Sequence, residues 1–170
     1  DVYGLAKLMG GKKSFIDKLQ MVFDEGLYDP ANEPDIAYPY LFSYFKGEEW
    51  RTQKETQRLL DKYFTTKPDG IPGNDDTGTM SSWAIFNMIG FYPDCPGLPE
   101  YTLTTPVFDK VTIRLDPKWY KEKELVIESN RAQPGTLYIN KVLLNGKKFN
   151  KYRITHDELV HGQHIYFDLK

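Results

Sequence analysis

The chain has 170 residues, and its 22 Lys and Arg nearly balance its 24 Asp and Glu, which gives a formal net charge of −2 at pH 7. This balance, without any basic run, argues against nucleic acid as a partner, and no apolar stretch is long enough to cross a membrane. The single cysteine, Cys95, excludes an internal disulfide bond.

The first half of the chain has the pattern of helices. For example, Phe15, Leu19, Val22 and Phe23 recur at the three- and four-residue spacings of one helical face. A later stretch, which begins at Thr79, is apolar nearly all round and is expected to be a buried helix. The expected helices are Asp1–Met9, Ser14–Glu25, Asp35–Phe45, Glu48–Phe64 and Thr79–Ile89.

The second half has the pattern of strands, because β-branched and aromatic residues alternate with polar ones after a proline-rich cluster. Asn145-Gly146 is a strong hairpin signal, and Thr155 is expected to cap a short helical turn. The expected strands are Tyr101–Thr105, Lys110–Leu115, Glu124–Glu128, Thr136–Leu144 and Gln163–Leu169. The predicted fold class is therefore α+β, with helices over residues 1–95 and a small antiparallel β-sandwich-like domain over residues 96–170.

A glycine-rich acidic loop, residues 70–78, immediately precedes the last expected helix. It carries the amide of Asn74 beside the adjacent carboxylates of Asp75 and Asp76. Neighbouring carboxylates repel one another, so such a loop needs a cation, hydrogen bonds or solvent to hold it. The simplest interpretation of the pattern alone is that Asp75, Asp76 and Thr77 cap the helix, where free N–H groups favour negative charge.

Longer motifs around this loop resemble the glycoside hydrolase family 92 α-mannosidases. They are GIPGNDDTGTMSSW at residues 70–83, IGFYP at 89–93, CPGLPEY at 95–101 and FDKVTI at 108–113, with NEP at 32–34, PYLF at 39–42 and WRTQ at 50–53. The resemblance runs along the whole chain, and several long motifs in the same order are more specific than one short pattern.

The resemblance implies an enzyme several times longer than this chain, with an N-terminal β-sandwich and a C-terminal helical (α/α)6 toroid. The chain is then expected to be its C-terminal portion, which lacks the N-terminal part. It starts directly in helical sequence without Met or a signal peptide. The resemblance also implies a periplasmic or secreted protein whose substrate partner is a mannose-containing glycan.

The same resemblance implies inverting, calcium-dependent hydrolysis, in which one carboxyl group protonates the leaving oxygen and another activates a water. It places the general base in the acidic loop, with Asp76 as the expected base and Asp75 as a calcium ligand or second carboxylate. This assignment applies to the motif and leaves open which aspartate has which role. Asn74 and Asp75 offer the oxygen ligands that calcium prefers, but the loop lacks the ligand spacing of an EF-hand.

The resemblance also implies substrate contacts from Asn32 and Glu33. Some family members have His before this Glu, so Asn32 argues against carrying over a preference for α-1,2 linkages. From the pattern alone, Asn32 and Asp35 are equally well explained as caps of the next helix. A second departure is Thr79, which stands where the family often has Gln.

The general acid of the family lies in a block upstream of this chain and has no match here, so the chain alone is expected to be inactive. An alternative function is a non-catalytic carbohydrate-binding or structural module, carried by the β half. The acidic loop favours the enzyme. His161 and His164, at a spacing of three on a strand, are not expected to share a metal, and Trp50 and Trp83 are expected in the core.

Overall fold

The computed structural model describes residues 1–170, and the chain divides into two compact units, Asp1–Ser81 and Ser82–Lys170. Phe86 and Ile89, in the last expected helix of the first half, pack against the hydrophobic core of the second unit. None of the helices combines the length and apolar character that crossing a bilayer requires.

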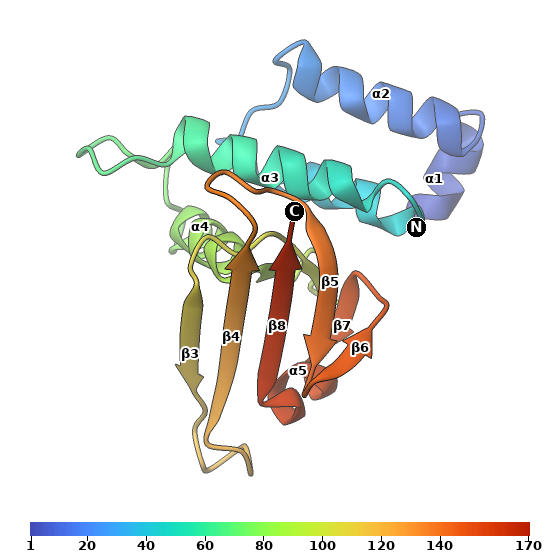
Figure 1. Cartoon of the computed structure of the whole chain (residues 1–170). Coiled ribbons are helices and arrows are strands. Elements are labelled where there is room, and N and C mark those ends of the chain that lie inside the picture. Colours follow the sequence, from blue (N-terminus) through green and yellow to red (C-terminus); the bar gives the residue numbers. More distant parts are fainter. The chain divides into compact units, whose positions relative to one another are not determined.

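The first unit is helical, and four of the five expected helices are confirmed as α-helices to within two residues at each end (Figure 1). Aromatic rings make much of its core: the Phe23 ring lies 5.2 Å from that of Tyr28 and 5.9 Å from that of Phe42. In chain order the helices are α1 (Val2–Leu8), α2 (Lys12–Asp24), the 3₁₀ helix η1 (Glu33–Tyr44), α3 (Glu49–Tyr63) and α4 (Thr79–Ile89), which continues into the second unit.

The element η1 corrects the expectation of an α-helix over Asp35–Phe45. Pro39 lies inside it and Pro34 at its start, and a proline inside a helix removes the N–H that an α-helical turn needs. The buried residues of η1 are Asp35, Pro39, Tyr40 and Phe42. Tyr38 and Leu41 are only partly buried.

A charged side chain lies inside this helical unit. Glu55 on α3 is fully buried, and its carboxylate accepts hydrogen bonds from Arg58 Nε at 2.6 Å and Gln20 Nε2 at 3.0 Å. Lys54 Nζ lies 3.4 Å away. Arg58 also donates to the carbonyl of Phe23 at 3.2 Å, so this cluster ties α3 to α2.

Replacing Arg58 with Met is expected to lower the free energy of unfolding by about 2 kcal/mol, because a buried carboxylate loses its shortest charged hydrogen bond. Lys13→Met is the matched control, since the Lys13–Asp17 pair is exposed on both sides and is expected to contribute less than about 0.5 kcal/mol. Urea unfolding followed by far-ultraviolet circular dichroism measures both. Equal losses for the two variants would contradict a buried role for this cluster.

The second unit contains two sheets. Strands β1 (Phe91–Tyr92), β2 (Glu100–Leu103) and β7 (Arg153–Thr155) form one sheet in the order β1-β2-β7. The larger sheet has the order β3-β4-β8-β5-β6 (Figure 1). Its strands are β3 (Lys110–Arg114), β4 (Glu124–Arg131), β5 (Ile139–Leu144), β6 (Lys147–Phe149) and β8 (His164–Leu169).

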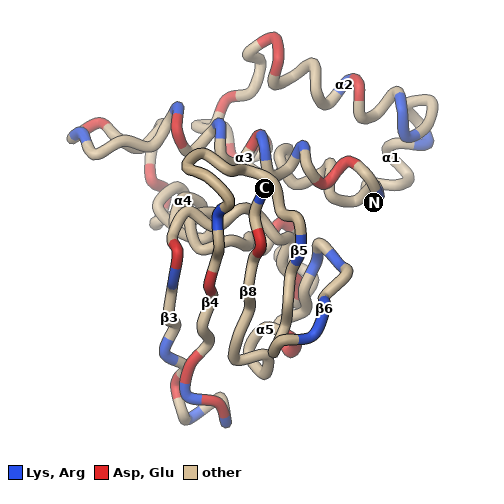
Figure 2. The backbone as a smooth tube through the Cα atoms, in the orientation of Figure 1, with Lys and Arg blue, Asp and Glu red and all other residues tan.

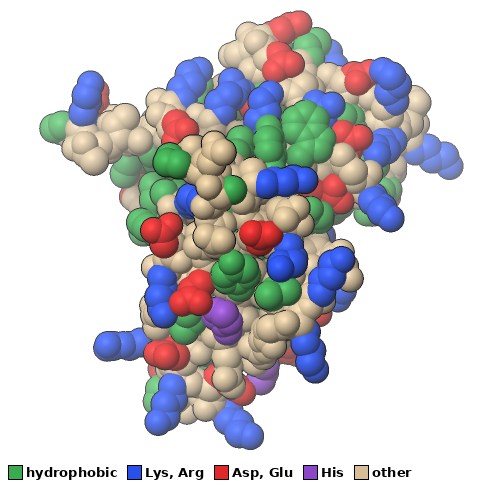
Figure 3. All heavy atoms as spheres, in the orientation of Figure 1, with side chains coloured by type: hydrophobic (Ala, Val, Ile, Leu, Met, Phe, Trp, Pro, Cys, Tyr) green, Lys and Arg blue, Asp and Glu red, His purple; other side chains and the backbone are tan.

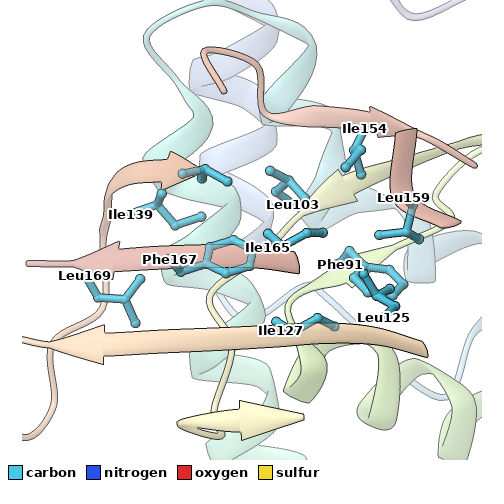
Figure 4. Packing of buried hydrophobic residues seen from close by; sticks show 11 residues of the cluster. Phe91, Leu103, Leu125, Ile127, Ile139, Ile154, Leu159, Ile165, Phe167 and Leu169 are labelled. Carbon is cyan, nitrogen blue, oxygen red and sulfur yellow. The ribbon is translucent and has the colours of Figure 1, made fainter. Parts of the chain in front are cut away.

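One hydrophobic core lies between these two sheets, as expected of a sandwich-like domain. Phe91 and Leu103 come from the smaller sheet and Ile127, Ile165 and Phe167 from the larger one, and each is at most 3% exposed. Figure 4 shows these side chains converging from both sheets. Alternation along β8, with every second residue buried, is the two-residue period of a strand with one face on a core.

The larger sheet is mixed rather than antiparallel throughout, because β4 and β8 pair in parallel. The chain reaches β8 only after passing through β5, β6, β7 and the helix α5 (His156–Gly162), and it then inserts between β4 and β5. The hairpin at Asn145-Gly146 is confirmed, with both residues at positive φ. Thr155 caps α5 as expected and forms a capping box with Glu158.

Candidate active site

The acidic loop connects α3 to α4 within the helical unit (Figure 1). A tight turn precedes it, where Thr65 N–H donates to the Gly70 carbonyl at 2.9 Å and Gly70 N–H donates to that of Lys67 at 2.9 Å. Its second half enters α4 directly, as Thr79 N–H donates to the Asp75 carbonyl at 2.7 Å. The loop is therefore an ordered turn that leads directly into the N-terminus of α4, as the sequence predicted.

The two aspartates of this loop have different environments. Asp75 is bound to the first turn of α4: its Oδ1 accepts from Ser81 N–H and its Oδ2 from Ser81 Oγ–H, both at 2.8 Å. The hydrogen bond from the Ser81 backbone, followed by that from its hydroxyl, lowers the pKa of the Asp75 carboxyl. Asp75 therefore has the capping role that the sequence pattern suggested for the loop.

Asp76 is exposed, and no hydrogen bond or ion pair involves its carboxylate. Its backbone is at φ 40° and that of Thr77 at φ 61°, a left-handed conformation that costs energy in residues other than glycine. Thr79 Oγ1 donates to the Asp76 carbonyl at 2.7 Å and holds this turn in place. Backbone strain that presents a free carboxylate is a common property of functional sites.

A small hollow, too tightly packed to hold a water molecule, brings this loop together with the Asn32-Glu33 block. Glu33, Asn74, Asp76 and Thr79 supply its polar side chains, and the side chains of the first three have no hydrogen-bond or ion-pair partner in the chain. Its full lining is Pro30, Ala31, Glu33, Ile36, Asn74, Asp76, Thr79 and Met80. Residues separated by about forty positions in the sequence thus share one pocket, and three of the five predicted site residues line it.

The two remaining predicted residues, Asn32 and Asp75, are turned to neighbouring side chains. Asn32 occupies the N-cap position of η1 without a cap hydrogen bond to the helix backbone, and its Nδ2 donates to Asp35 Oδ1 at 3.3 Å. Asp35 is 7% exposed and also accepts from Asp29 N–H at 3.0 Å. Asp35 therefore stabilises the loop that carries Glu33, a role that the sequence pattern does not indicate.

Close contact between the two loops explains the glycine at position 73. A Cβ at Gly73 would lie 2.5 Å from the Ala31 Cβ and 3.0 Å from its Cα, and the residue is at φ 62°. A side chain here would push the acidic loop away from the Glu33 segment. Gly78 is also left-handed, at φ 87°, but has open space where its Cβ would be.

These two glycines form a matched pair for a test. Gly78→Ala is expected to lower the free energy of unfolding by about 1–2 kcal/mol, because alanine is strained in the left-handed backbone conformation. Gly73→Ala is expected to cost about 1 kcal/mol more, because overpacking adds to the same backbone cost. Thermal unfolding of both variants measures the difference. A Gly73→Ala variant as stable as Gly78→Ala would show that the two loops do not need their close approach.

The chemistry of the pocket suits a hard cation only in part. Two carboxylates and an amide oxygen are ligands of the kind calcium prefers, but calcium takes about six to eight of them. The chain contains no group of three or more His, Cys, Asp or Glu side chains arranged to hold a metal. His164 instead contacts Glu128 at 2.8 Å. Calcium ligation by Asn74 and Asp75 stays a prediction.

Comparison with known proteins identifies the family to which this site belongs. The family model of the glycosyl hydrolase family 92 catalytic domain matches residues 1–170. The chain is 29% identical over 162 residues to an uncharacterized secreted glycosidase of Arthroderma benhamiae, which covers 95% of this chain and 21% of that protein.

Two solved structures from Bacteroides thetaiotaomicron are also similar. The inverting mannosidase BT2199 of family GH92 superposes with a TM-score of 0.85 at 31% identity, over 100% of this chain and 26% of that one. The GH92 α-mannosidase BT3965, solved in complex with mannoimidazole, superposes with a TM-score of 0.73 at 32% identity. This match covers 82% of this chain and 18% of that one. The chain thus spans about a quarter or less of these relatives.

Proposed function

The chain belongs to glycosyl hydrolase family 92, and from this membership we propose that it forms part of a calcium-dependent, inverting exo-α-mannosidase that removes mannose from glycans. The observation that carries the proposal is the pocket that unites Glu33 with Asp76. Two similar structures support it, one described as an inverting mannosidase and the other as an α-mannosidase in complex with mannoimidazole. A secreted or periplasmic location is proposed from the secreted relative.

Asp76 is the general base in this proposal. An inverting glycosidase needs a carboxylate that takes a proton from a water on the face of the sugar opposite the leaving group. The Asp76 carboxylate is exposed to solvent and free of internal partners, so a water can reach it. Its left-handed backbone, held by Thr79 Oγ1, fixes the direction in which the side chain leaves the loop.

Asp75 is proposed to position Asp76 rather than to exchange a proton with water. Both of its oxygens accept hydrogen bonds from Ser81, which fastens the residue before Asp76 to the first turn of α4. A lowered pKa keeps this carboxyl ionised and makes it a weaker base. We therefore propose Asp76 as the base and give Asp75 the positioning role.

Glu33 and Asn32 are proposed to contact the substrate beside the base. Glu33 lines the pocket, and its chain neighbours are held by Asp35 through Asn32 Nδ2 and Asp29 N–H. Bound calcium would supply positive charge that polarises the hydroxyl groups of the sugar. Glu33 and Asn74, which line the pocket beside Asp76, would hold it in this chain, with further ligands coming from outside the chain.

The helical unit is proposed to contribute the last helices of an (α/α)6 toroid. The general acid is proposed to lie in a segment that matches the region of the relatives not covered by this chain. We therefore assign the activity to the full-length protein, by which we mean this chain joined to that segment. The chain alone is expected to leave α-mannosides intact, because a catalytic pair without its acid loses orders of magnitude in rate.

Hydrolysis of aryl glycosides by the full-length protein tests the proposal. We expect release of the aryl group from the α-mannoside but not from the β-mannoside or the α-glucoside. Treatment with EDTA is expected to abolish the activity, and added Ca²⁺ but not Mg²⁺ to restore it, because Mg²⁺ demands a tighter octahedral shell. Full activity after chelation would overturn the calcium assignment, and a preference for another glycoside would overturn the substrate.

A further inference from the structure

The segment from Ser129 to His156 has a strong local excess of positive charge in a chain whose net charge is −2. It contains no Asp or Glu, and its six cations are Arg131, Lys141, Lys147, Lys148, Lys151 and Arg153. Figure 2 shows the β5–β6 hairpin in this segment with blue and no red positions. Such a one-signed stretch raises the local concentration of anions.

Three of these cations already have acidic partners elsewhere in the fold. Arg153 pairs with Asp94 and Glu100, Lys151 with Glu158 at 3.1 Å, and Arg131 lies 3.9 Å from Asp109. Lys141, Lys147 and Lys148 form no ion pair within the chain. All three are exposed, and Figure 3 shows Lys and Arg side chains in blue on this side of the β unit, so their charges are accessible to a ligand.

The ends of β5 and β6 leave an open groove beside these lysines. β5 runs from Ile139 to Leu144, but β6 pairs only with its last three residues. Beyond Phe149 the chain turns away, and a groove of about 200 Å³ lies between the unpaired half of β5 and the departing segment. Its lining is Ile139, Asn140, Lys141, Val142, Lys148, Phe149, Asn150, Lys151 and Tyr152.

The groove combines a polar, cationic rim with aromatic walls. Lys141 and Lys148 are exposed, while Phe149 and Tyr152 are half-buried and pack against the core cluster of the unit. The nearest carboxylate on the strand beside β5, Asp168, accepts from Asn140 Nδ2 at 2.8 Å and forms no ion pair with Lys141. Two lysine ammonium groups suit a phosphate as point charges, and aromatic faces suit the C–H face of a sugar ring.

We propose that this groove binds the phosphate ester of a single sugar unit, with Lys141 and Lys148 on the phosphate and Tyr152 on the ring, since the Lys151 ammonium already lies 5.7 Å from the centroid of the Phe149 ring. A volume of about 200 Å³ is below the range of drug-sized pockets, which fits one sugar unit rather than an extended chain. The groove lies wholly within the β unit and shares no residue with the Glu33–Asp76 pocket. The inference therefore stands or falls separately from the proposed mannosidase activity.

Titration calorimetry of the full-length protein with glucose 6-phosphate at low ionic strength tests this inference. A glucose derivative is chosen because the proposed catalytic pocket is expected to prefer mannose. We expect a single-site affinity on the order of 1 mM, with glucose and inorganic phosphate each binding more weakly. Each of Lys141→Gln and Lys148→Gln is expected to weaken the affinity about three- to fivefold, the range of an exposed charge contact, and the double variant about tenfold.

Lys121→Gln, which removes an exposed charge from the β3–β4 connection, is the control and is expected to leave the affinity unchanged. Glucose 6-sulfate separates the two kinds of anionic ester, and it is expected to bind more weakly than the doubly charged phosphate. The proposal would be overturned by unchanged affinity in the Lys141→Gln/Lys148→Gln variant. Binding of inorganic phosphate as tight as that of glucose 6-phosphate would also overturn it, since the ring would then contribute nothing.

Discussion

Replacing Asp76 with Asn in the full-length protein is expected to lower kcat for α-mannoside hydrolysis about a thousandfold or more. Asn keeps the size of the side chain and removes its basicity, and a positioned general base is commonly worth about 10²–10⁴ in rate. Because the carboxylate has no partner inside the chain, the substitution breaks no internal hydrogen bond. We therefore expect the melting temperature to change little, so that the loss of rate reports on chemistry.

Asp75→Asn is the matched comparison, because it changes the adjacent carboxylate by the same atoms. It weakens the hydrogen bonds to Ser81, so we expect a lower melting temperature and a smaller loss of kcat than for Asp76→Asn. An activated aryl mannoside is the substrate of choice, since its leaving group departs with little help from the acid. The assignment of the base would be wrong if Asp75→Asn lost far more rate than Asp76→Asn, or if both kept near-full activity.

The largest expected loss of stability follows from replacing Arg153 with Met. The Arg153 guanidinium contacts Asp94 through Nη2 at 3.0 Å, Glu100 through Nε at 3.1 Å and Thr102 Oγ1 through Nη1 at 2.9 Å. The Asp94 side chain is only 2% exposed. Removing one partner of a buried pair leaves an uncompensated charge, which costs about 3–5 kcal/mol.

Arg114→Met is the control for this variant, because Arg114 is exposed on β3 and its loss is expected to cost no more than about 0.5 kcal/mol. Adding Asp94→Asn to the Arg153→Met variant is expected to recover part of the stability by removing the stranded charge. Urea unfolding compares all three proteins. If Arg153→Met were as stable as Arg114→Met, the Asp94–Arg153 pair would not hold β7 to its sheet.

Local patterns predicted most of the helices and turns. The three- and four-residue spacing located α2, and the Asn145-Gly146 signal located the β5–β6 hairpin. The apolar residues of η1 have spacings that an α-helix also shows, whereas Pro39 lacks the N–H that an α-helical turn needs. The parallel pairing of β4 with β8 depends on strands separated by a long connection, and no local pattern carries that information.

The sequence predicted the candidate site as a set of motifs, and the structure shows that residues within one motif have different environments. The sequence placed Asp75 and Asp76 together, but only the fold shows that Ser81 takes the Asp75 oxygens and that Asp76 shares a pocket with Glu33. Asp35 was considered only as a helix cap. Its burial and its bonds to Asn32 and Asp29 depend on how the loop folds back, which residue spacing does not reveal.

The anomer of mannose that forms first tests the central claim most directly, namely that Asp76 acts as a base on water rather than as a nucleophile. Proton NMR can follow hydrolysis of an aryl α-mannoside by the full-length protein before mutarotation mixes the anomers. Direct attack by a base-activated water inverts the anomeric carbon, so β-mannose is expected to appear first. Initial release of α-mannose would require a covalent intermediate and would contradict the role assigned to Asp76.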